Sequence, residues 1–389
     1  MNLKTILLMW LLTSSLTYSQ KLEKAHKKVD SLFQKQLRQK NVHNAFLTVH
    51  SNRLGIDWNY AQGNFKDGTP VSENNPFLST SIAKTYTATL VMILQEEGKL
   101  DVDDSLAEYL PSDIIEGLHI YKDVDYSQQI RIKQLLNHTS GLPDYFEDAP
   151  NEGPAFMELL FSDPEKMWNP LETIDFAKSK LTPHFLPGKG YHYSDTEYVL
   201  LGLLIEELTG KPLHEVLSEK LFRPLNMQNT YMHLRSQPLD ESTGKLAELY
   251  VDDAEISSFK SLSADWAGGG LATTAQDLLK FHKALNEEKL VSKKSLRQMQ
   301  KWVKESFGLE YGYGLRKFQL KKLNPLLGRL TLIGHSGTSG AFMYYCPEMD
   351  VYLTGTFNQT AYQKKHVVFM MQVLAQLKSL KKGKDNEEG

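Results

Sequence analysis

Segments with strand character lie at both ends of this 389-residue chain, and the middle has almost none. In residues 45–50 and 55–60 apolar residues alternate or cluster, and a polar turn separates the two segments. This pattern predicts a β-hairpin. Because strands must pair, the fold expected is mixed α/β (α+β), with one antiparallel sheet built from both termini and flanked by helices. Four more strands are predicted near the end, at residues 313–320, 330–333, 341–346 and 351–357.

Helical spacing of apolar residues fills the rest of the chain. Residues 21–40 predict an amphipathic helix, and residues 80–97 predict a buried one with hydroxyl residues at its N-cap and Gly98 past its end. The sheet part is expected at about residues 21–100 and 255–380, with a helical insertion at about 101–250 and a disordered charged tail at 381–389. Further helices are predicted at residues 132–138, 171–179, 198–208, 213–221, 275–285 and 362–380.

Cysteine content and charge exclude several classes of protein. Cys346 is the only cysteine, so no internal disulfide and no Cys-rich metal site can form, and it is expected to be a buried thiol at a strand end. Lys and Arg total 44 against 47 Asp and Glu, so the chain has no excess positive charge that would attract nucleic acid, and no role in nucleic-acid binding is expected. A chain of this length is instead stabilised by a large apolar core.

The first nineteen residues have the pattern of a secretory signal. Lys4 precedes an apolar run over residues 6–12, and small or hydroxyl residues follow at 17–19. The run is much shorter than the ~20 residues of a membrane span. The sequence therefore predicts cleavage near Ser19 and export to the periplasm or the outside of the cell, with a retained N-terminal helix as the alternative.

Common catalytic motifs are missing. No G-x-S-x-G motif and no phosphate-binding glycine loop occur, and His214-Glu215 lacks the second histidine of a zinc-protease helix because residue 218 is serine. What remains is a serine followed three residues later by a lysine, Ser81 and Lys84, at the start of the buried helix. That spacing puts both side chains on one helical face, where an amine can take the proton of a serine nucleophile.

The serine–lysine spacing alone is weak evidence, because it also occurs at Ser242/Lys245, Ser257/Lys260 and Ser379/Lys382. Only Ser81 and Lys84 begin a long apolar helix. Two more segments follow them in order: residues 191–195 read Tyr-His-Tyr-Ser-Asp before an apolar helix, and residues 334–338 read Gly-His-Ser-Gly-Thr between two strands.

In this order the three motifs resemble those of the serine β-lactamase-related hydrolases, a group with class C β-lactamases, D-alanyl-D-alanine carboxypeptidases, D-aminopeptidases and esterases. The resemblance extends from about residue 45 to residue 377. It implies that Ser81 is the acylated nucleophile, Lys84 its proton partner and Tyr193 a second acid/base group. It also implies that the backbone amides of Ser81 and Thr338 form the oxyanion hole, that Gly337 allows close approach of the substrate, and that His335 binds substrate.

The chain departs from the family pattern at one motif position and uses a rarer choice at another. Asp195 stands where the family usually has Asn, so a carboxylate replaces an amide donor and favours protonated Lys84. His335 holds a substrate carboxylate less firmly than Lys does, because its reference pKa is ~6.5. Both features favour amine-bearing amides or esters as much as D-Ala-D-Ala peptides.

The sequence thus predicts an exported serine hydrolase that cleaves an amide or ester of a small molecule or short peptide through an acyl-enzyme on Ser81. No cofactor or metal is expected. The alternative is a non-catalytic relative that binds a cell-wall peptide or fragment. The acidic and aromatic segment at residues 144–170 is expected to overhang the site, and His138 is expected to be structural. The natural substrate and the oligomeric state stay open.

Overall fold

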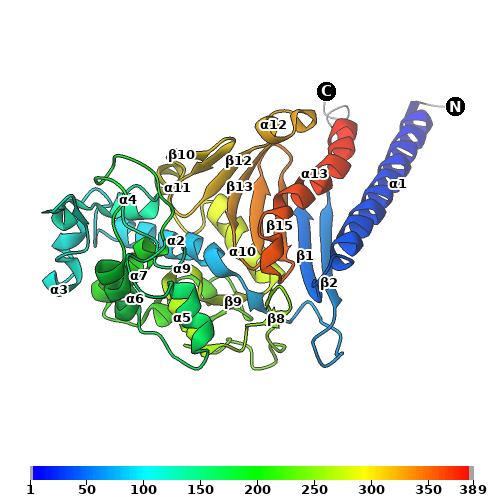
Figure 1. Ribbon diagram of the computed structural model, residues 1–389. Coiled ribbons are helices and arrows are strands. Elements are labelled where there is room, and N and C mark those ends of the chain that lie inside the picture. The colour runs from blue at the N-terminus through cyan, green and yellow to red at the C-terminus, as the bar shows by residue number, and fades with distance from the viewer. Residues whose placement is uncertain (1–2, 385–389) are drawn as a thin grey trace.

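An antiparallel sheet of eight strands forms the centre of the protein (Figure 1). The computed structural model describes residues 3–384, and the side chains of residues 18–380. The expected sheet from both termini is confirmed, because the N-terminal hairpin joins the C-terminal strands through β1 and β15. From one edge to the other the strands are β10 (Val303–Ser306), β11 (Leu309–Tyr311), β12 (Arg316–Gln319), β13 (Thr331–Ser336), β14 (Phe342–Cys346), β15 (Val351–Thr356), β1 (Asn44–Ser51) and β2 (Ile56–Gly63).

Helices cover both faces of this sheet (Figure 1). The terminal helices α1 (Leu3–Leu37) and α13 (Lys365–Lys384) pack on each other and on one face, where Phe33 and Phe369 share a core with β1 and β14. The helices α2 (Ala83–Glu96) and α10 (Ala275–Asn286) lie on the other side, in the larger core. Each apolar strand face is thereby removed from water.

The middle of the chain is helical apart from two-residue strands, as predicted, and lies at the far side of α2 (Figure 1). Two of its helices, α7 (Asp195–Thr209) and α9 (Trp266–Gly269), pack against α2 and carry groups of the site. The elements of this part and of the remaining connections are β3 (Phe77–Leu78), η1 (Thr80–Ile82), η2 (Leu106–Glu108), α3 (Ser112–Ile115), β4 (Ile120–Tyr121), β5 (Val124–Asp125), η3 (Ser127–Gln129), α4 (Ile132–Leu136), α5 (Phe156–Ser162), α6 (Pro170–Lys180), α8 (Leu213–Leu217), η4 (Ser218–Phe222), β6 (Tyr231–Met232), β7 (Tyr250–Val251), β8 (Ala254–Glu255), η5 (Lys260–Asp265), β9 (Leu271–Thr273), α11 (Lys293–Met299), α12 (Leu320–Leu323), η6 (Pro325–Leu327) and η7 (Thr360–Tyr362).

The chain termini differ from the sequence prediction in part. Helix α1 includes most of the predicted signal segment. Helix α13 continues to Lys384, so the first four residues of the predicted disordered tail are helical, because the buried Leu377 and Leu380 keep the last turns on the core; residues 385–389 lie outside the described residues. Within the described residues, no helix combines the length and the apolarity needed to cross a membrane.

Candidate active site

The turn before α2 presents Ser81 to solvent. Ser81 lies in the 3-10 turn η1, after Thr80, whose φ of 45° is unusual for a residue with a side chain. The prediction that a hydroxyl side chain caps the N-terminus of α2 is wrong, because no side chain makes that bond. Ser79 Oγ instead donates to the Leu271 carbonyl at 3.0 Å. Thr80 Oγ1 lies 3.3 Å from Ser339 Oγ. These hydroxyls hold the turn against the sheet, so Ser81 is fixed in place.

Lys84 is the buried centre of the site. Its side chain is fully removed from solvent, and its ammonium donates to Ser81 Oγ at 3.4 Å, to the Gly268 carbonyl at 3.1 Å and to Asp195 Oδ1. Burial alone lowers the pKa of Lys84, but the charge of Asp195, together with Tyr193, outweighs burial and raises it above its ordinary value. Lys84 is therefore a cation in the resting protein.

Asp195 reaches Lys84 because it is the first residue of α7. Its backbone N–H donates to Asp144 Oδ1 at 3.1 Å, which fixes the start of that helix. The third residue of α9, Gly268, lies beside the ion pair, and a Cβ there would be 2.7 Å from Asp195 Oδ1. Glycine at residue 268 is thus explained by close packing on the ion pair.

Tyr193 lies between two cations. Lys84 Nζ is 5.0 Å from its ring centroid, and the guanidinium carbon of Arg316 is 4.8 Å from it on β12. Burial raises the pKa of Tyr193 above its ordinary value, although Lys84 acts in the opposite direction. The hydroxyl is therefore a neutral acid at rest, placed to give a proton to a leaving group.

Gly337 and Thr338 bring the end of β13 beside Ser81. A Cβ on Gly337 would lie 1.9 Å from Thr80 Oγ1 and 2.4 Å from the Ser79 carbonyl, so only glycine allows this approach. Thr338, in the following turn, is exposed and lines the same pocket as Ser81. The serine turn and the strand end thus form one wall.

His335 does not line the pocket, which differs from the expected role. Its Nε2 lies 2.9 Å from the Tyr311 hydroxyl and its Nδ1 2.9 Å from the Ser336 carbonyl, and it is fully buried. Side chains of neighbouring strand residues point to opposite faces of the sheet, and here Ser336, the next residue, lines the pocket in place of His335. Burial, with Arg316, holds the pKa of His335 well below its ordinary value, so it is neutral.

Arg316 is the pocket cation that the sequence analysis missed. It pairs with Gly334 across β12 and β13, and its guanidinium donates to both carboxylate oxygens of Glu305 at 2.9 and 3.1 Å. It lies within a predicted strand, but only strand pairing brings it to the pocket. The sequence contains no motif that marks it.

His138 has the structural role that was expected. It is buried, and its ring lies on Tyr193 with centroids 4.3 Å apart. Its Nδ1 faces Glu197 Oε2 and also accepts the Ser194 N–H at 3.3 Å. Burial lowers the pKa of His138 and raises that of Glu197, so an uncharged acid donates to an uncharged imidazole behind Tyr193.

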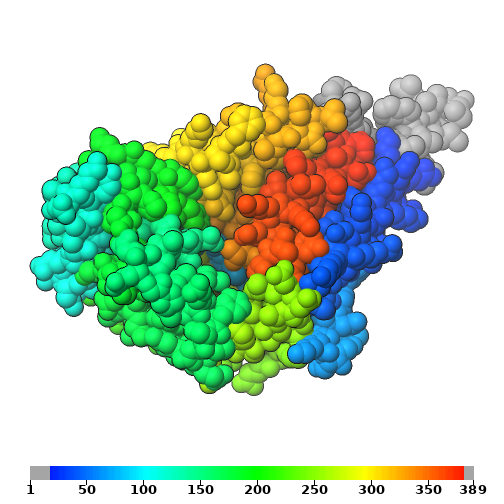
Figure 2. All heavy atoms as spheres, viewed as in Figure 1, coloured from blue at the N-terminus to red at the C-terminus, as the bar shows by residue number. Residues whose placement is uncertain are grey.

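Two lobes of one depression meet at Ser81, Asp195 and Thr338, between the helical part and the C-terminal strands and helix (Figure 2). The larger lobe has a volume of about 690 Å³ and is called the polar lobe here because it contains Tyr193, Arg316 and Glu305, although Leu309 and Phe318 give it an apolar wall as well. The apolar lobe, about 230 Å³, is covered by the segment predicted to overhang the site. Its apolar lining consists of Leu78, Phe146, Met157, Leu160, Phe161, Leu249, Val251, Ile256, Phe259 and Leu262.

Carboxyl groups dominate the polar lining near Ser81. Asp144, Glu147, Asp195 and Asp265 line one lobe or both. Burial, with the charge of Asp195, raises the pKa of Asp265 to about 7. Burial likewise raises the pKa of Asp144 well above its ordinary value. Raised pKa values favour the uncharged forms of Asp144 and Asp265. The carboxylates that can attract a cationic group and disfavour a substrate carboxylate are therefore Glu147 and Asp195, which line both lobes.

Asp265 predicts a pH-dependent stability. Its pKa is higher in the fold than the 3.8 of a free carboxyl, so its stabilising contribution is full at low pH and is lost as the pH rises toward 7. We expect Asp265→Asn to gain stability relative to the wild type over that interval, by on the order of 1–3 kcal/mol. Urea unfolding at about pH 5 and about pH 8 measures this difference. A difference independent of pH would contradict the assignment.

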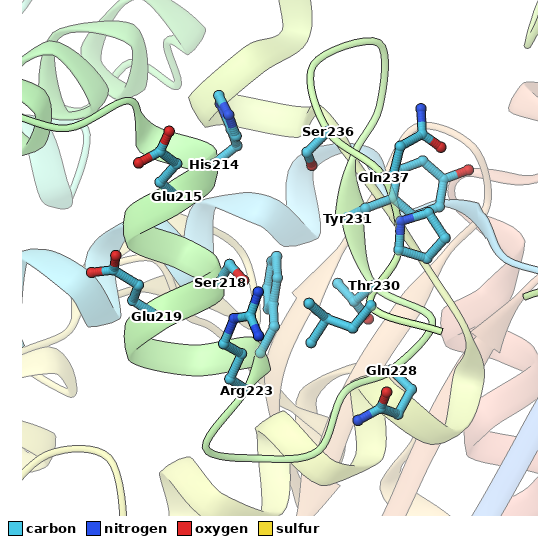
Figure 3. Close-up of a pocket in the computed structure, with 13 residues that line it drawn as sticks. His214, Glu215, Ser218, Glu219, Arg223, Gln228, Thr230, Tyr231, Ser236 and Gln237 are labelled. Atoms are coloured by element: carbon cyan, nitrogen blue, oxygen red, sulfur yellow. The ribbon is translucent and has the colours of Figure 1, made fainter. Parts of the chain in front are cut away.

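A separate pocket of about 690 Å³ lies between α8 with η4 and residues 228–239 (Figure 3). The helical wall carries His214, Glu215 and Glu219, and Thr230 and Gln237 belong to the other wall. It contains none of the predicted site residues, so the chemistry is assigned to the depression at Ser81.

The described fold, with a partly exposed Ser81 in contact with the buried Lys84, defines a protein of the β-lactamase/transpeptidase fold. A family model described as Beta-lactamase matches residues 29–372. The chain therefore belongs to the Beta-lactamase family.

Curated relatives include Penicillin-binding protein 4* of Bacillus subtilis (strain 168), 28% identical over 284 residues that cover 69% of this chain and 56% of that protein. The D-aminopeptidase of Brucella anthropi is 24% identical, covering 72% and 48%. The chain thus spans about half the length of these relatives.

Among solved structures, a D-stereospecific amidohydrolase from Streptomyces sp. has a TM-score of 0.72 at 26% identity and covers 90% of this chain and 97% of that one. A D-amino acid amidase from Ochrobactrum anthropi SV3, complexed with L-phenylalanine amide, has a TM-score of 0.74 at 23% identity, covering 91% and 99%; this second likeness concerns the fold alone.

Proposed function

We propose that the protein is a serine hydrolase that cleaves an amide or ester bond of a D-amino acid derivative through an acyl-enzyme on Ser81. The observation that carries this proposal is the contact of buried Lys84 with both Ser81 and Asp195, at the junction of two open lobes. A buried cation needs such partners, and one of them is a serine that reaches solvent.

Acylation needs a base, although Lys84 is protonated at rest. As Ser81 Oγ bonds to the substrate carbonyl carbon, Lys84 takes the serine proton and passes one of its own to Asp195, so the lysine stays a cation. When the carbon–nitrogen or carbon–oxygen bond breaks, Tyr193 protonates the leaving group and recovers a proton from Lys84. Asp195 then returns its proton to Lys84. Water attacks the ester carbon and gives one proton to the same groups. As the bond between that carbon and Ser81 Oγ breaks, Oγ takes this proton and the acid product leaves.

The negative charge on the carbonyl oxygen has two backbone donors in this proposal, the amides of Ser81 and Thr338. Thr338 lies on the wall that glycine at 337 brings against the serine turn. Such donors act strongly because they are fixed before the reaction starts.

The pocket lining favours a substrate with an apolar side chain and a free amine. The small apolar lobe suits the side chain, and the carboxylates of Glu147 and Asp195, which line both lobes, suit an ammonium group. The preference for D-residues is inferred from the relatives named above, whose names include a D-aminopeptidase and a D-stereospecific amidohydrolase.

Covalent labelling tests the proposal. We expect a fluorophosphonate to add one adduct to the folded protein, located at Ser81 by peptide mass mapping, and we expect faster hydrolysis of D-phenylalanine amide than of its L-isomer. No adduct in a folded sample would instead favour the alternative of a non-catalytic protein that binds a cell-wall peptide. An adduct at Ser81 without faster hydrolysis of the D-amide would contradict the proposed substrate class but would support Ser81 as the nucleophile.

Asp195→Asn tests the proposed recognition of an amine. Loss of the carboxylate removes an attractive charge, so we expect KM for D-amino acid amides to rise by roughly 10-fold, which corresponds to about 1.4 kcal/mol. The proton acceptor is lost for every substrate, so kcat should fall throughout. The ratio of kcat/KM for peptides ending in D-Ala-D-Ala, which carry a carboxylate, to that for D-amino acid amides is expected to increase. Steady-state kinetics on both substrates measure the change, and unaltered selectivity would show that Asp195 serves Lys84 alone.

We also propose that the protein is exported, on the basis of its first nineteen residues. The charged start, the apolar run and the small residues near Ser19 support this. N-terminal sequencing of the protein recovered from cells tests it, and an intact Met1 on the recovered protein would contradict it.

A further inference from the structure

Three side chains converge at the rim of the polar lobe, outside the catalytic groups. Nε2 of His184 lies 2.7 Å, and Nε2 of His192 3.0 Å, from the same oxygen of Asp148. The three candidate ligand atoms all lie within 4.8 Å of one another. The two imidazole rings face each other with centroids 3.6 Å apart. Two imidazole nitrogens and a carboxylate oxygen thus surround one point.

The backbone holds these three residues in place. The His184 N–H donates to the Gly141 carbonyl at 2.9 Å, and the His192 N–H donates to the His138 carbonyl at 3.0 Å. The Asp144 N–H donates to Asp148 Oδ2 at 2.8 Å and orients the carboxylate. The bond to the Asp148 carboxylate is of the kind that orients ligating carboxylates in metal sites, and the two backbone bonds fix the positions of the histidines. A ligand set already assembled loses little entropy on binding.

The donor atoms select the class of ion. Two imidazoles and one carboxylate suit Zn²⁺ and similar first-row ions, whereas Mg²⁺ and Ca²⁺ prefer oxygen alone. Metal–ligand distances of ~2.0–2.2 Å require ligand atoms roughly 3–3.5 Å apart. The two distances from Asp148 Oδ2 to the histidine nitrogens, 2.7 and 3.0 Å, are already close to that spacing. Their exposed fractions are 38% for His184, 25% for His192 and 19% for Asp148, which leaves access for the ion and a water ligand.

We propose that Asp148, His184 and His192 form a binding site for a divalent ion of the Zn²⁺ type that braces the catalytic pocket. His192 lines the polar lobe and directly precedes Tyr193. Asp144, which orients Asp148, also accepts the N–H of Asp195. The ion therefore ties the loop around Asp148 to the segment that carries the catalytic tyrosine. This departs from the expectation that the protein carries no metal, and it is independent of the proposed hydrolysis.

Metal titration of the whole protein tests the site. Protein prepared without a histidine tag is stripped with a chelator and titrated with Zn²⁺ against a chromophoric competitor, and with Co²⁺ by visible absorption. The variants are Asp148→Asn and His184→Ala. The control is His214→Ala, which removes a partly exposed histidine in the separate pocket of Figure 3. Circular dichroism of the stripped proteins checks that each is folded.

We expect one Zn²⁺ per chain for the wild type and the control, with a rise in Tm on binding, and at least ~10-fold weaker binding for both variants. Co²⁺ should give intense visible bands in the wild type that the variants lack. Absent binding by the folded wild type, or equal binding by His184→Ala, would overturn the proposal. The three side chains would then be a hydrogen-bonded cluster only.

Discussion

Ser81→Ala is expected to reduce kcat on the best amide substrate by on the order of 10⁴-fold or more, because no other group can form the acyl-enzyme. The fold should survive. The lost contact is the 3.4 Å hydrogen bond from Lys84, worth about 1 kcal/mol, and Lys84 keeps Asp195 and the Gly268 carbonyl. Steady-state kinetics, with intact mass after a fluorophosphonate, measure both losses.

The matched control is Ser242→Ala, which alters a second serine three residues before a lysine. Ser242 Oγ donates to Asp240 at 2.7 Å in an exposed turn, so this substitution should leave turnover and labelling unchanged. Residual turnover near the wild-type rate in Ser81→Ala would remove the acyl-enzyme mechanism. Loss of folding in that variant would instead leave labelling of the wild type as the decisive result.

Gly337→Ala should have the second largest effect. The added Cβ would overlap Thr80 Oγ1 and the Ser79 carbonyl, at 1.9 and 2.4 Å, so the strand end and the serine turn must separate. Because the amide of Thr338 then moves away from Ser81, we expect kcat/KM to fall by roughly 10²–10³-fold. Overpacking should also cost about 1–3 kcal/mol in the free energy of unfolding.

Gly334→Ala separates these two effects. Its Cβ would overlap the Met343 carbonyl on the neighbouring strand β14, away from the serine turn. This variant should lose stability with a much smaller loss of kcat/KM per folded molecule. Equal activity losses in the two variants would show that general distortion of β13, and not the position of Thr338, explains the effect.

The fold was largely predictable because its signals are local. The hairpin of β1 and β2 and the helix after Ser81 each follow from spacing within a few residues. Helix α5 lies in the insertion that was predicted to be helical, although its bounds were not predicted. The strands β10 and β11 were not predicted, because packing against neighbouring strands stabilises such short strands more than their own sequence does. Helix α11 does have a local signal that was not used, the N-cap Ser292.

The site was predictable only where a motif marks it. Ser81 and Lys84 meet as their helical spacing requires, and residues 193–195 and 337–338 reach them in the fold. Arg316 and Asp265 were missed, because strand pairing and the packing of distant loops bring them to the pocket. The prediction that His335 binds substrate differs from the structure. The motif indicates which strand carries His335, but the alternation of side chains along that strand determines the sheet face to which its ring points.

The pairing of β1 with β15 has a consequence for how the chain reaches its structure. Phe46 is paired with Thr356, so the sheet joins residues that are separated by most of the sequence. Contacts of such long range slow folding, since most of the chain must be ordered before they form. The N-terminal hairpin is synthesised first, and the backbone groups of β1 that later bond to β15 stay unpaired until then. An unpaired strand edge of this kind promotes aggregation. A product truncated before residue 351 lacks the partner of that edge and is expected to aggregate.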